Sequence, residues 1–218
     1  MVKRRVLVTG GAGFLGSALV RELCAAGTSV VVLDDLSTGR AVDLAPEAEL
    51  LVGDVADPAI VRKAAGGCEV LFHLAAARAV PRSIEEPLET DTANVHGTLA
   101  ALVAAREAGV RRVVLASSSS VYGQPAVVPT PESAPLAPAS PYGVSKLAGE
   151  HYGRVFGELH GLEVVALRYF NLYGPGQRAD LVHATLVPRL LAALRGGGRP
   201  EVHGDGCQRR DFTYVSDA

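Results

Sequence analysis

Short apolar runs alternate with helical patterns through most of this chain, and this alternation restricts its fold more than any other feature. Six runs bounded by Gly, Asp or Ser predict buried strands: Val6–Thr9, Ser29–Leu33, Glu49–Val52, Val70–Leu74, Val113–Ser117 and Val164–Leu167. Four patterns between them predict helices: Phe14–Ala26, Pro58–Ala65, Asn94–Ala108 and Pro141–His160. Repeated strand–helix units of this kind predict an α/β fold, a doubly wound parallel sheet with helices on both faces.

Two stretches depart from this rhythm. The segment Pro125–Ser140 contains five prolines and few periodic apolar positions, which indicates an ordered loop or lid. After Tyr169 the alternation stops, and three pieces are expected: a helix over Leu181–Arg195, a turn at Gly196–Gly198, and two short extended segments within Glu201–Val215. The prediction is therefore a main domain over residues 1–170 and a small, incomplete second lobe over residues 171–218.

Charge and composition exclude several classes of protein. A net charge of −2 over 218 residues argues against nucleic acid or an anionic membrane as the main partner. Cys24, Cys68 and Cys207 are far apart and odd in number, which is typical of reduced thiols in a cytosolic protein. The histidines have no metal-ligand spacing, so no metal is expected. The first apolar stretch is too short for a signal peptide and no run could span a membrane, so the expectation is a cytoplasmic protein.

The first predicted strand leads into a glycine-rich turn and a helix. Gly10, Gly13 and Gly16 have the spacing Gly-x-x-Gly-x-x-Gly. This spacing suits a tight turn in which the backbone approaches a pyrophosphate at a helix N-terminus. Glycines at a strand end can also serve a turn that binds nothing. The strand before, the helix after and the acidic Asp34 at the end of the next strand favour a dinucleotide site.

Three further strand ends fit that interpretation. The Asp34 carboxylate can hold two ribose hydroxyls and would repel a 2′-phosphate, which favours NAD over NADP. Asp54 could accept from an adenine amino group, and Asp57 suits the N-cap of the following helix better than Asp54 does. The small residues of Leu74–Ala76 would leave room for a cofactor, and His73 before them is predicted to be a core histidine.

Tyr142 and Lys146 are four residues apart in a predicted helix, which places both on one face. An ammonium near a phenol favours the phenolate and lowers its pKa from about 10, so the tyrosine could act as a general base. The chain has eighteen arginines and three lysines, and a flexible point charge is retained at this position.

The four serines of Ser117–Ser120 follow the fifth predicted strand. In open α/β sheets, ligands bind beyond the carboxyl ends of the strands, where this cluster lies. The same cluster could instead form a helix cap or a turn.

Several motifs occur together in one order along the chain. They are the glycine turn, Asp34–Gly39, Phe72–Ala76, Ser117–Gly123, Tyr142-x-x-x-Lys146 and Arg168–Pro175. As a set this resembles the extended short-chain dehydrogenase/reductases of the NAD-dependent epimerase/dehydratase family, and among them the UDP-glucose 4-epimerases most. The resemblance covers essentially all 218 residues and implies a Rossmann-type sheet.

The resemblance implies roles for individual residues. Tyr142 would be the acid/base, Lys146 would bind nicotinamide ribose and lower the tyrosine pKa, and Ser118 would be the catalytic serine, with Ser119 as the second choice. The implied cofactor-binding residues are Gly10, Gly13, Phe14, Leu15, Gly16, Asp34, Asp35, Ser37, Thr38, Gly39, Asp54, Val55, Leu74, Ala75, Ala76, Asn94, Ser117, Tyr142, Lys146 and Tyr169. The implied substrate-binding residues are Arg78, Ser118, Ser119, Tyr142, Asn171, Val187 and Arg210.

Asn171 and Arg210 match positions that hold the nucleotide diphosphate, and Arg210 could alternatively be a surface charge paired with Asp211. The implied reaction removes the proton from the sugar 4-hydroxyl, passes a hydride to NAD, and returns it to the opposite face of the 4-keto sugar. Dehydratases of the family carry an Asp-Glu pair after the catalytic serine or threonine, where this chain has Ser119 and Ser120. Dehydratase activity is therefore disfavoured.

Family members continue past the counterpart of residue 218, which implies a truncated chain or a partner that completes the substrate lobe. Three alternatives remain: another nucleotide-sugar epimerase or decarboxylase (for UDP-hexuronates or UDP-N-acetylhexosamines), a non-catalytic NAD-binding module, and an NADPH-dependent reductase. The alanine-rich helices Asn94–Ala108 and Pro141–His160 carry more apolar positions than one sheet face needs, which predicts a homodimer through these two helices.

Overall fold

The computed structural model describes residues 4–125, 127–200 and 204–218. It forms two compact units, Met1–Tyr169 and Phe170–Ala218, and each is described by itself.

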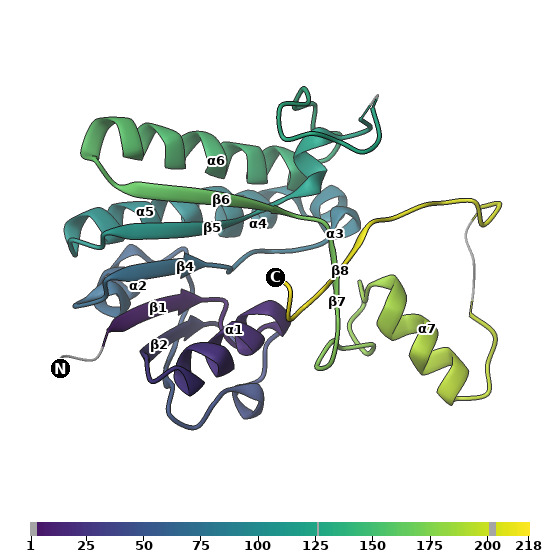
Figure 1. The fold of residues 1–218 in the computed structure, drawn as a ribbon, viewed down its shortest axis with the longest axis horizontal. Coiled ribbons are helices and arrows are strands. Elements are labelled where there is room, and N and C mark those ends of the chain that lie inside the picture. Colours follow the sequence, from purple (N-terminus) through teal and green to yellow (C-terminus); the bar gives the residue numbers. More distant parts are fainter. Residues whose placement is uncertain (1–3, 126, 201–203) are drawn as a thin grey trace. The chain divides into compact units, whose positions relative to one another are not determined.

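Six parallel strands in the order β3-β2-β1-β4-β5-β6 form the sheet of the first unit (Figure 1). Their bounds are β1 (Arg5–Thr9), β2 (Ser29–Asp34), β3 (Glu49–Val52), β4 (Val70–His73), β5 (Arg112–Ser118) and β6 (Glu163–Tyr169). The chain runs outward from β1 to β3 and then crosses back to β4 on the other side of β1. This is the strand order of a Rossmann-type doubly wound sheet, with its switch point between β1 and β4. The predicted fold class is confirmed.

Helices cover both faces of this sheet. On one face lie α2 (Pro58–Ala65), α5 (Gly97–Glu107) and α6 (Pro141–His160), and on the other lies α1 (Phe14–Ala25). Alternate residues of β1 divide between the two cores: Leu7 packs with α2 and α5, whereas Val6 and Val8 pack with α1. This follows from the two-residue period of a strand, whose side chains point alternately to opposite faces. The central strands β1 and β2 are accordingly apolar and buried, whereas the edge strand β6 leaves Val165 and Leu167 partly exposed.

The helical segment before β5 is longer than predicted. It includes α3 (Val80–Glu85), α4 (Pro87–Asp91) and the π-helical turn η2 (Thr92–His96), which leads into α5. A helix start at Asn94 was therefore wrong. Pro87 is the first residue of α4, and a proline suits that position because its missing N–H would have no partner there.

The second unit contains a small parallel pair, β7 (Asn171–Tyr173) and β8 (Phe212–Tyr214), and one helix, α7 (Leu186–Arg195). The predicted helix began too early, at Leu181, because Pro188 has no N–H and is tolerated only in the first turn. Of the two extended segments expected, β8 is one, and residues 201–203 lie outside the described part of the chain.

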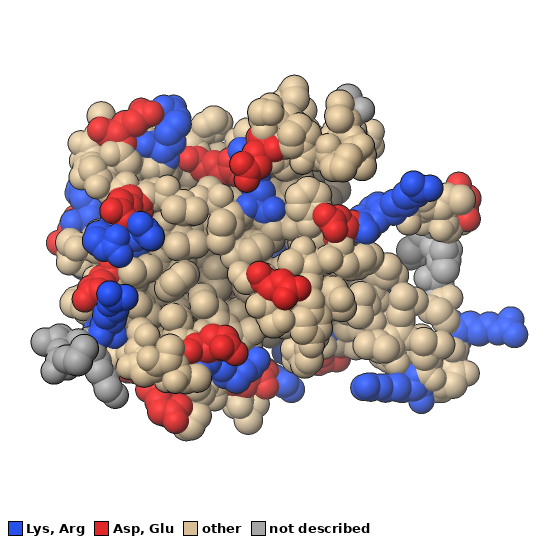
Figure 2. All heavy atoms as spheres, viewed as in Figure 1, with Lys and Arg blue, Asp and Glu red and all other residues tan. Residues whose placement is uncertain are grey.

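No helix among the described residues is long and apolar enough to cross a membrane. On the face seen in Figure 2, basic and acidic side chains are interspersed and neither sign gathers into one patch. Many of them form exposed pairs, such as Arg154 with Glu158 on α6.

Candidate active site

The glycine turn after β1 leaves no room for side chains. A Cβ at Gly10 would lie 2.6 Å from the backbone nitrogen of Ala75, and Gly10 has a φ of 69°. A Cβ at Gly16 would lie 2.1 Å from the carbonyl oxygen of Gly10. The N-cap of α1 is Gly13, which has no side chain to cap the first turn. The amides at this helix start are therefore available to an anion, so the turn fits a dinucleotide pyrophosphate.

Asp34 ends β2 beside this turn and is only 8% exposed. Its Oδ2 accepts from the backbone N–H of Ala12 and its Oδ1 from that of Leu36, both at 2.9 Å. The carboxylate thus joins the glycine turn to the loop after β2. A carboxylate has about four acceptor sites, so two remain for the ribose hydroxyls that the sequence assigns to it.

The loop after β2 packs against the glycine turn. A Cβ at Gly39 would lie 2.7 Å from the backbone of Ala12, and Arg40 N donates to Ala12 O at 3.1 Å. Asp35 Oδ1 accepts from both the N–H and the hydroxyl of Ser37, which closes a tight turn. Asp35, Ser37, Thr38 and Gly39 therefore follow β2 as a folded loop beside the predicted pyrophosphate site.

The ends of β3 and β4 complete this edge of the sheet. Asp54 lies after β3 and accepts from Ala56 N, while Asp57, as predicted, caps α2 by accepting from Ala59 N at 2.9 Å. Val55 beside them is buried. Leu74, Ala75 and Ala76 follow β4 and are partly exposed.

Asn94 lies in the π-helical turn η2 and is 2% exposed. Its amide donates to Ala77 O and to Ser145 Oγ, and its Oδ1 accepts from Ala77 N. The extra residue of a π-helical turn allows a side chain to leave the regular ladder, and such turns are frequent at functional sites. Asn94 thereby ties the loop after β4 to α6.

Ser118, Tyr142 and Lys146 come together at the carboxyl end of β5. Ser140 caps α6 by accepting from Gly143 N at 3.1 Å, and Pro141 occupies the first turn. Tyr142 therefore lies in the first turn, where the Ser118 side chain is close enough to affect its pKa. Lys146 Nζ lies 5.8 Å from the centre of the Tyr142 ring and donates to Ala116 O at 2.8 Å.

The pKa of Tyr142 differs in direction from the sequence-based expectation. Burial raises it above 10, and the hydrogen bond with Ser118 and the charge of Arg78 oppose that rise. The charge of Arg78 thus acts against the rise caused by burial, and the Lys146 ammonium donates to the Ala116 carbonyl. Burial lowers the pKa of Lys146 to about 8, so its ammonium form still predominates at neutral pH.

The serine cluster after β5 divides into different roles. Ser118 Oγ accepts from Ser120 N at 3.1 Å and so caps the short helix η3 (Ser119–Tyr122). Ser118 therefore caps a short helix, as the alternative interpretation predicted, and also interacts with Tyr142. Ser117 instead donates to Glu150 on α6. Ser119 begins η3 and is partly exposed.

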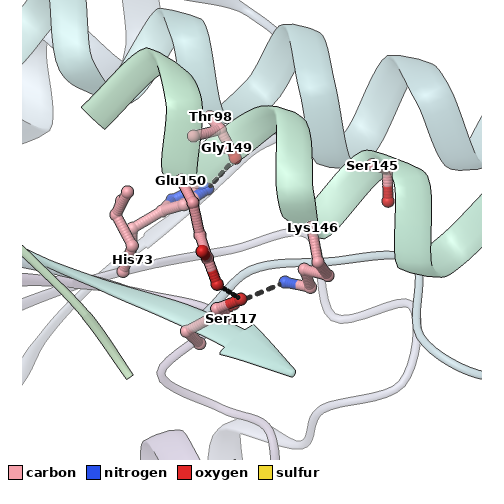
Figure 3. A pocket seen from close by; sticks show the side chains of 9 residues that line it. His73, Thr98, Ser117, Ser145, Lys146, Gly149 and Glu150 are labelled. Atoms are coloured by element: carbon pink, nitrogen blue, oxygen red, sulfur yellow. Dashed lines mark hydrogen bonds between the residues drawn. The ribbon is translucent and has the colours of Figure 1, made fainter. Parts of the chain in front are cut away.

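A cavity of about 10 Å³ lies behind this group, lined by His73, Thr98, Leu115, Ala116, Ser117, Ser145, Lys146, Gly149 and Glu150 (Figure 3). It is large enough for a water molecule at most. His73 is 3% exposed and lies between Thr9 and Thr98, as expected of a core histidine. Burial lowers its pKa to about 3.

Sequence reasoning missed Glu150 and Arg168, which form an ion pair beside this cavity. The signal for Glu150 was its position, four residues after Lys146 and eight after Tyr142, which gives all three the same helix face. Arg168 is the first residue of the motif Arg168–Pro175, but the sequence analysis assigned no function to it.

The remaining predicted residues are on separate elements. Arg78 follows β4, and Tyr169 ends β6, where burial raises its pKa. Asn171, Val187 and Arg210 belong to the second unit. Asn171 Nδ2 donates to Asp211 O at 2.8 Å, Val187 lies in the first turn of α7, and the Arg210 guanidinium donates to Arg209 O. Among the described residues, no three His, Cys, Asp or Glu side chains are grouped to hold a metal ion.

Comparison with known proteins extends this picture. The model of the NAD dependent epimerase/dehydratase family matches residues 6–218. A UDP-glucose 4-epimerase of Mycolicibacterium smegmatis is 43% identical over 98% of this chain and 70% of its own length. A structure of UDP-glucose 4-epimerase from Thermotoga maritima with UDP-glucose has a TM-score of 0.95 at 35% identity, covering 98% of this chain and 70% of that one. The complex of the Thermus thermophilus UDP-glucose 4-epimerase with NAD has a TM-score of 0.88 at 36% identity, covering 98% and 71%.

Proposed function

The chain belongs to the NAD dependent epimerase/dehydratase family, and on that premise we propose that it is a nucleotide-sugar 4-epimerase of the UDP-glucose/UDP-galactose type. The observation that carries the proposal is the grouping of Ser118, Tyr142 and Lys146 at the end of β5, with Lys146 Nζ 5.8 Å from the centre of the Tyr142 ring. A hydroxyl pair of this kind can take a proton from a sugar alcohol and return it. The glycine turn and Asp34 support a dinucleotide site on the same edge of the sheet.

The residues of this chain divide the work as follows. The chemistry that NAD would supply there is reversible hydride transfer at C4 of the sugar. Tyr142 accepts the proton of the 4-hydroxyl and later donates it back, and Ser118 orients that hydroxyl. Arg78 stabilises the phenolate, since its charge lowers the pKa of Tyr142. Lys146 holds nicotinamide ribose hydroxyls with its ammonium group.

Ser119 and Ser120 favour epimerisation over loss of water. Both are in η3, directly after Ser118, and neither is ionisable at neutral pH. A dehydratase needs an acid and a base to remove a β-hydroxyl, and these two positions offer none.

We also propose that the two predicted parts of the chain have different functions. Residues 1–170 would bind NAD and carry Ser118, Tyr142 and Lys146. Residues 171–218 would be the partial substrate lobe, in which Asn171 and Arg210 hold the diphosphate. Arginine suits this task because its planar fork of donors matches phosphate oxygens.

Conversion of UDP-glucose to UDP-galactose by the purified protein tests the proposal. Tyr142→Phe should lower kcat on the order of 10²–10⁴-fold, because the proton acceptor is lost. Tyr152→Phe, a half-buried tyrosine on the same helix, is the matched control and should leave kcat unchanged. Equal rates for Tyr142→Phe and the parent would show that the tyrosine mechanism is wrong. NAD binding without turnover of any nucleotide sugar would favour a non-catalytic module.

A homodimer through α5 and α6 is a further part of the proposal. Within this chain α5 is mostly buried by its neighbours, whereas α6 leaves Val144 and Leu159 exposed, by 55% and 71%. In such an interface α6 would therefore contribute more exposed apolar surface than α5. Light scattering at micromolar concentration measures the mass, and a monomeric mass would contradict the dimer.

A further inference from the structure

Glu150 shares the helix face of the two proposed site residues on α6. It lies one turn after Lys146 and two turns after Tyr142, and its side chain is only 11% exposed. Figure 3 shows it directed toward the end of β5 together with Lys146. A carboxylate in this position must be satisfied by partners from other elements.

Those partners are Ser117 and Arg168. Glu150 Oε1 accepts from Ser117 Oγ and, at 2.9 Å, from Arg168 Nε, while Oε2 accepts from Arg168 Nη2 at 2.8 Å. The guanidinium thus binds the carboxylate through two parallel bonds, the geometry that restricts direction as well as distance.

The other side of Arg168 binds two more segments. Its Nη1 donates to Tyr122 Oη at 2.8 Å and to the carbonyl of Glu132 at 3.0 Å. The guanidinium also lies 5.0 Å from the centre of the Tyr122 ring. The ion pair therefore connects α6, the end of β5, β6, η3 and the proline-rich loop before α6.

A largely buried ion pair is an energetically costly link between these five segments. Arg168 and Glu150 are 23% and 11% exposed, and burying both charges costs free energy that apolar side chains of similar volume would not. Burial acts to raise the pKa of Glu150, but hydrogen bonds from Arg168 and Ser117 outweigh it and lower the pKa. The pKa of Arg168 is raised, chiefly by Glu150. The pair stays charged through the neutral range, and its distinctive contribution is fixed orientation.

We propose that Glu150 and Arg168 are positioning residues that hold Ser118 against Tyr142; the catalytic meaning of this contact rests on the proposed function. Ser117 is the point of attachment. Its bond to Glu150 fixes the rotation of the strand end and with it the direction of the next side chain, Ser118. Arg168 fixes the other side of Ser118 by holding η3, which Ser118 caps.

Glu150→Gln is the principal test. The amide keeps the size of the side chain but cannot pair with both guanidinium nitrogens of Arg168. We expect kcat to fall on the order of 10- to 100-fold with little change in KM, as for a small misplacement of reacting groups. The pKa of Tyr142 should rise, since the nearby Ser118 side chain acts to lower that pKa. The alkaline shift of the kcat profile distinguishes positioning from a merely structural role.

Arg168→Lys tests the two parallel hydrogen bonds from the guanidinium to Glu150. Lysine keeps the charge but offers a point charge without a planar fork, so we expect the same direction of change as for Glu150→Gln. The matched control is Glu158→Gln, which breaks the exposed pair of Arg154 and Glu158 on the same helix. It should leave kcat and the Tyr142 pKa unchanged.

A second readout separates this inference from the proposed function. In NAD-bound protein labelled at tyrosine Cζ, carbon NMR follows the titration of Tyr142, assigned with Tyr142→Phe. If no nucleotide sugar is turned over but Glu150→Gln raises the Tyr142 pKa, the positioning role stands and the epimerase proposal fails. If Glu150→Gln and Arg168→Lys fold and leave both the titration and kcat unchanged, the positioning role is wrong. Should neither fold, Ser117→Ala removes the same link with less disruption, and the same two outcomes decide.

Discussion

At the scale of the residue, His73 shows how a hydrogen-bond chain determines a protonation state. Thr98 Oγ1 donates its proton to Asn94 O, so it must accept from His73 Nε2–H. His73 Nδ1 is then the acceptor, and Thr9 Oγ1 donates to it at 2.9 Å. The ring is therefore the neutral Nε2–H form, held between β1 and α5. Burial and, secondarily, the charge of Lys146 lower its pKa from 6.5 to about 3.

This neutral histidine should make folding stability depend on acid. Below pH 6.5 the unfolded chain binds a proton at His73 that the folded chain does not bind until about pH 3. Stability is thus lost as the pH falls through this window. Lowering the pH from 7 to 5 should remove about 2 kcal/mol of unfolding free energy, at 1.36 kcal/mol per pH unit. Urea unfolding at the two pH values measures it.

His73→Asn should remove most of that difference between pH 7 and pH 5, even though it lowers stability at both. The control is His151→Asn, an exposed histidine on α6, which should keep the full difference. An equal pH dependence in all three proteins would show that His73 is not the group responsible.

At the scale of the element, the start of α6 determines where Tyr142 lies. Ser140 and Pro141 define the N-terminus, and Tyr142 is in the first turn, where helices fray most readily. Asp57 is the corresponding cap of α2, followed by Pro58. The two helices thus begin with the same chemistry, a polar cap and a proline, in different parts of the first unit.

The pair of caps allows a matched comparison. Ser140→Ala and Asp57→Ala should each lower the unfolding free energy by about 1 kcal/mol, because one backbone donor loses its partner. Only Ser140→Ala should also lower kcat at saturating NAD, because fraying there displaces Tyr142. Urea unfolding and epimerase assays measure the two effects. An equal loss of kcat in both variants would mean that general destabilisation, and no local fraying, is responsible.

At the scale of the whole molecule, the dinucleotide site should stabilise the folded chain when it is filled. A ligand at 100 times its Kd adds about 2.7 kcal/mol to the unfolding free energy. We expect this from NAD and much less from NADP at the same concentration, because the buried Asp34 carboxylate would face the 2′-phosphate. Thermal unfolding with each cofactor measures the difference. Equal stabilisation would contradict the role of Asp34 and revive an NADP-dependent activity.

The sheet and the main motifs were accessible from sequence because they depend on local patterns. Apolar strands buried on both faces, the glycine turn and the Tyr142/Lys146 spacing are each encoded within a few neighbouring residues. Their common location followed from one rule of α/β sheets, that strand ends gather at one edge. The errors were at helix starts, at Asn94 and Leu181, where cap chemistry and prolines decide and apolar periodicity does not.

The sequence by itself determined the fold class, and it predicted the chemical groups of the candidate site and the edge of the sheet where they lie. Only the tertiary structure decided which groups interact there: burial raises the pKa of Tyr142 while Ser118 and Arg78 oppose that rise, and Glu150 binds Ser117 and Arg168. The physical reason is the separation along the chain of the residues that interact. Strand and helix patterns arise between residues close in the chain, whereas burial and charge act between residues brought together by folding, such as Glu150 and Arg168.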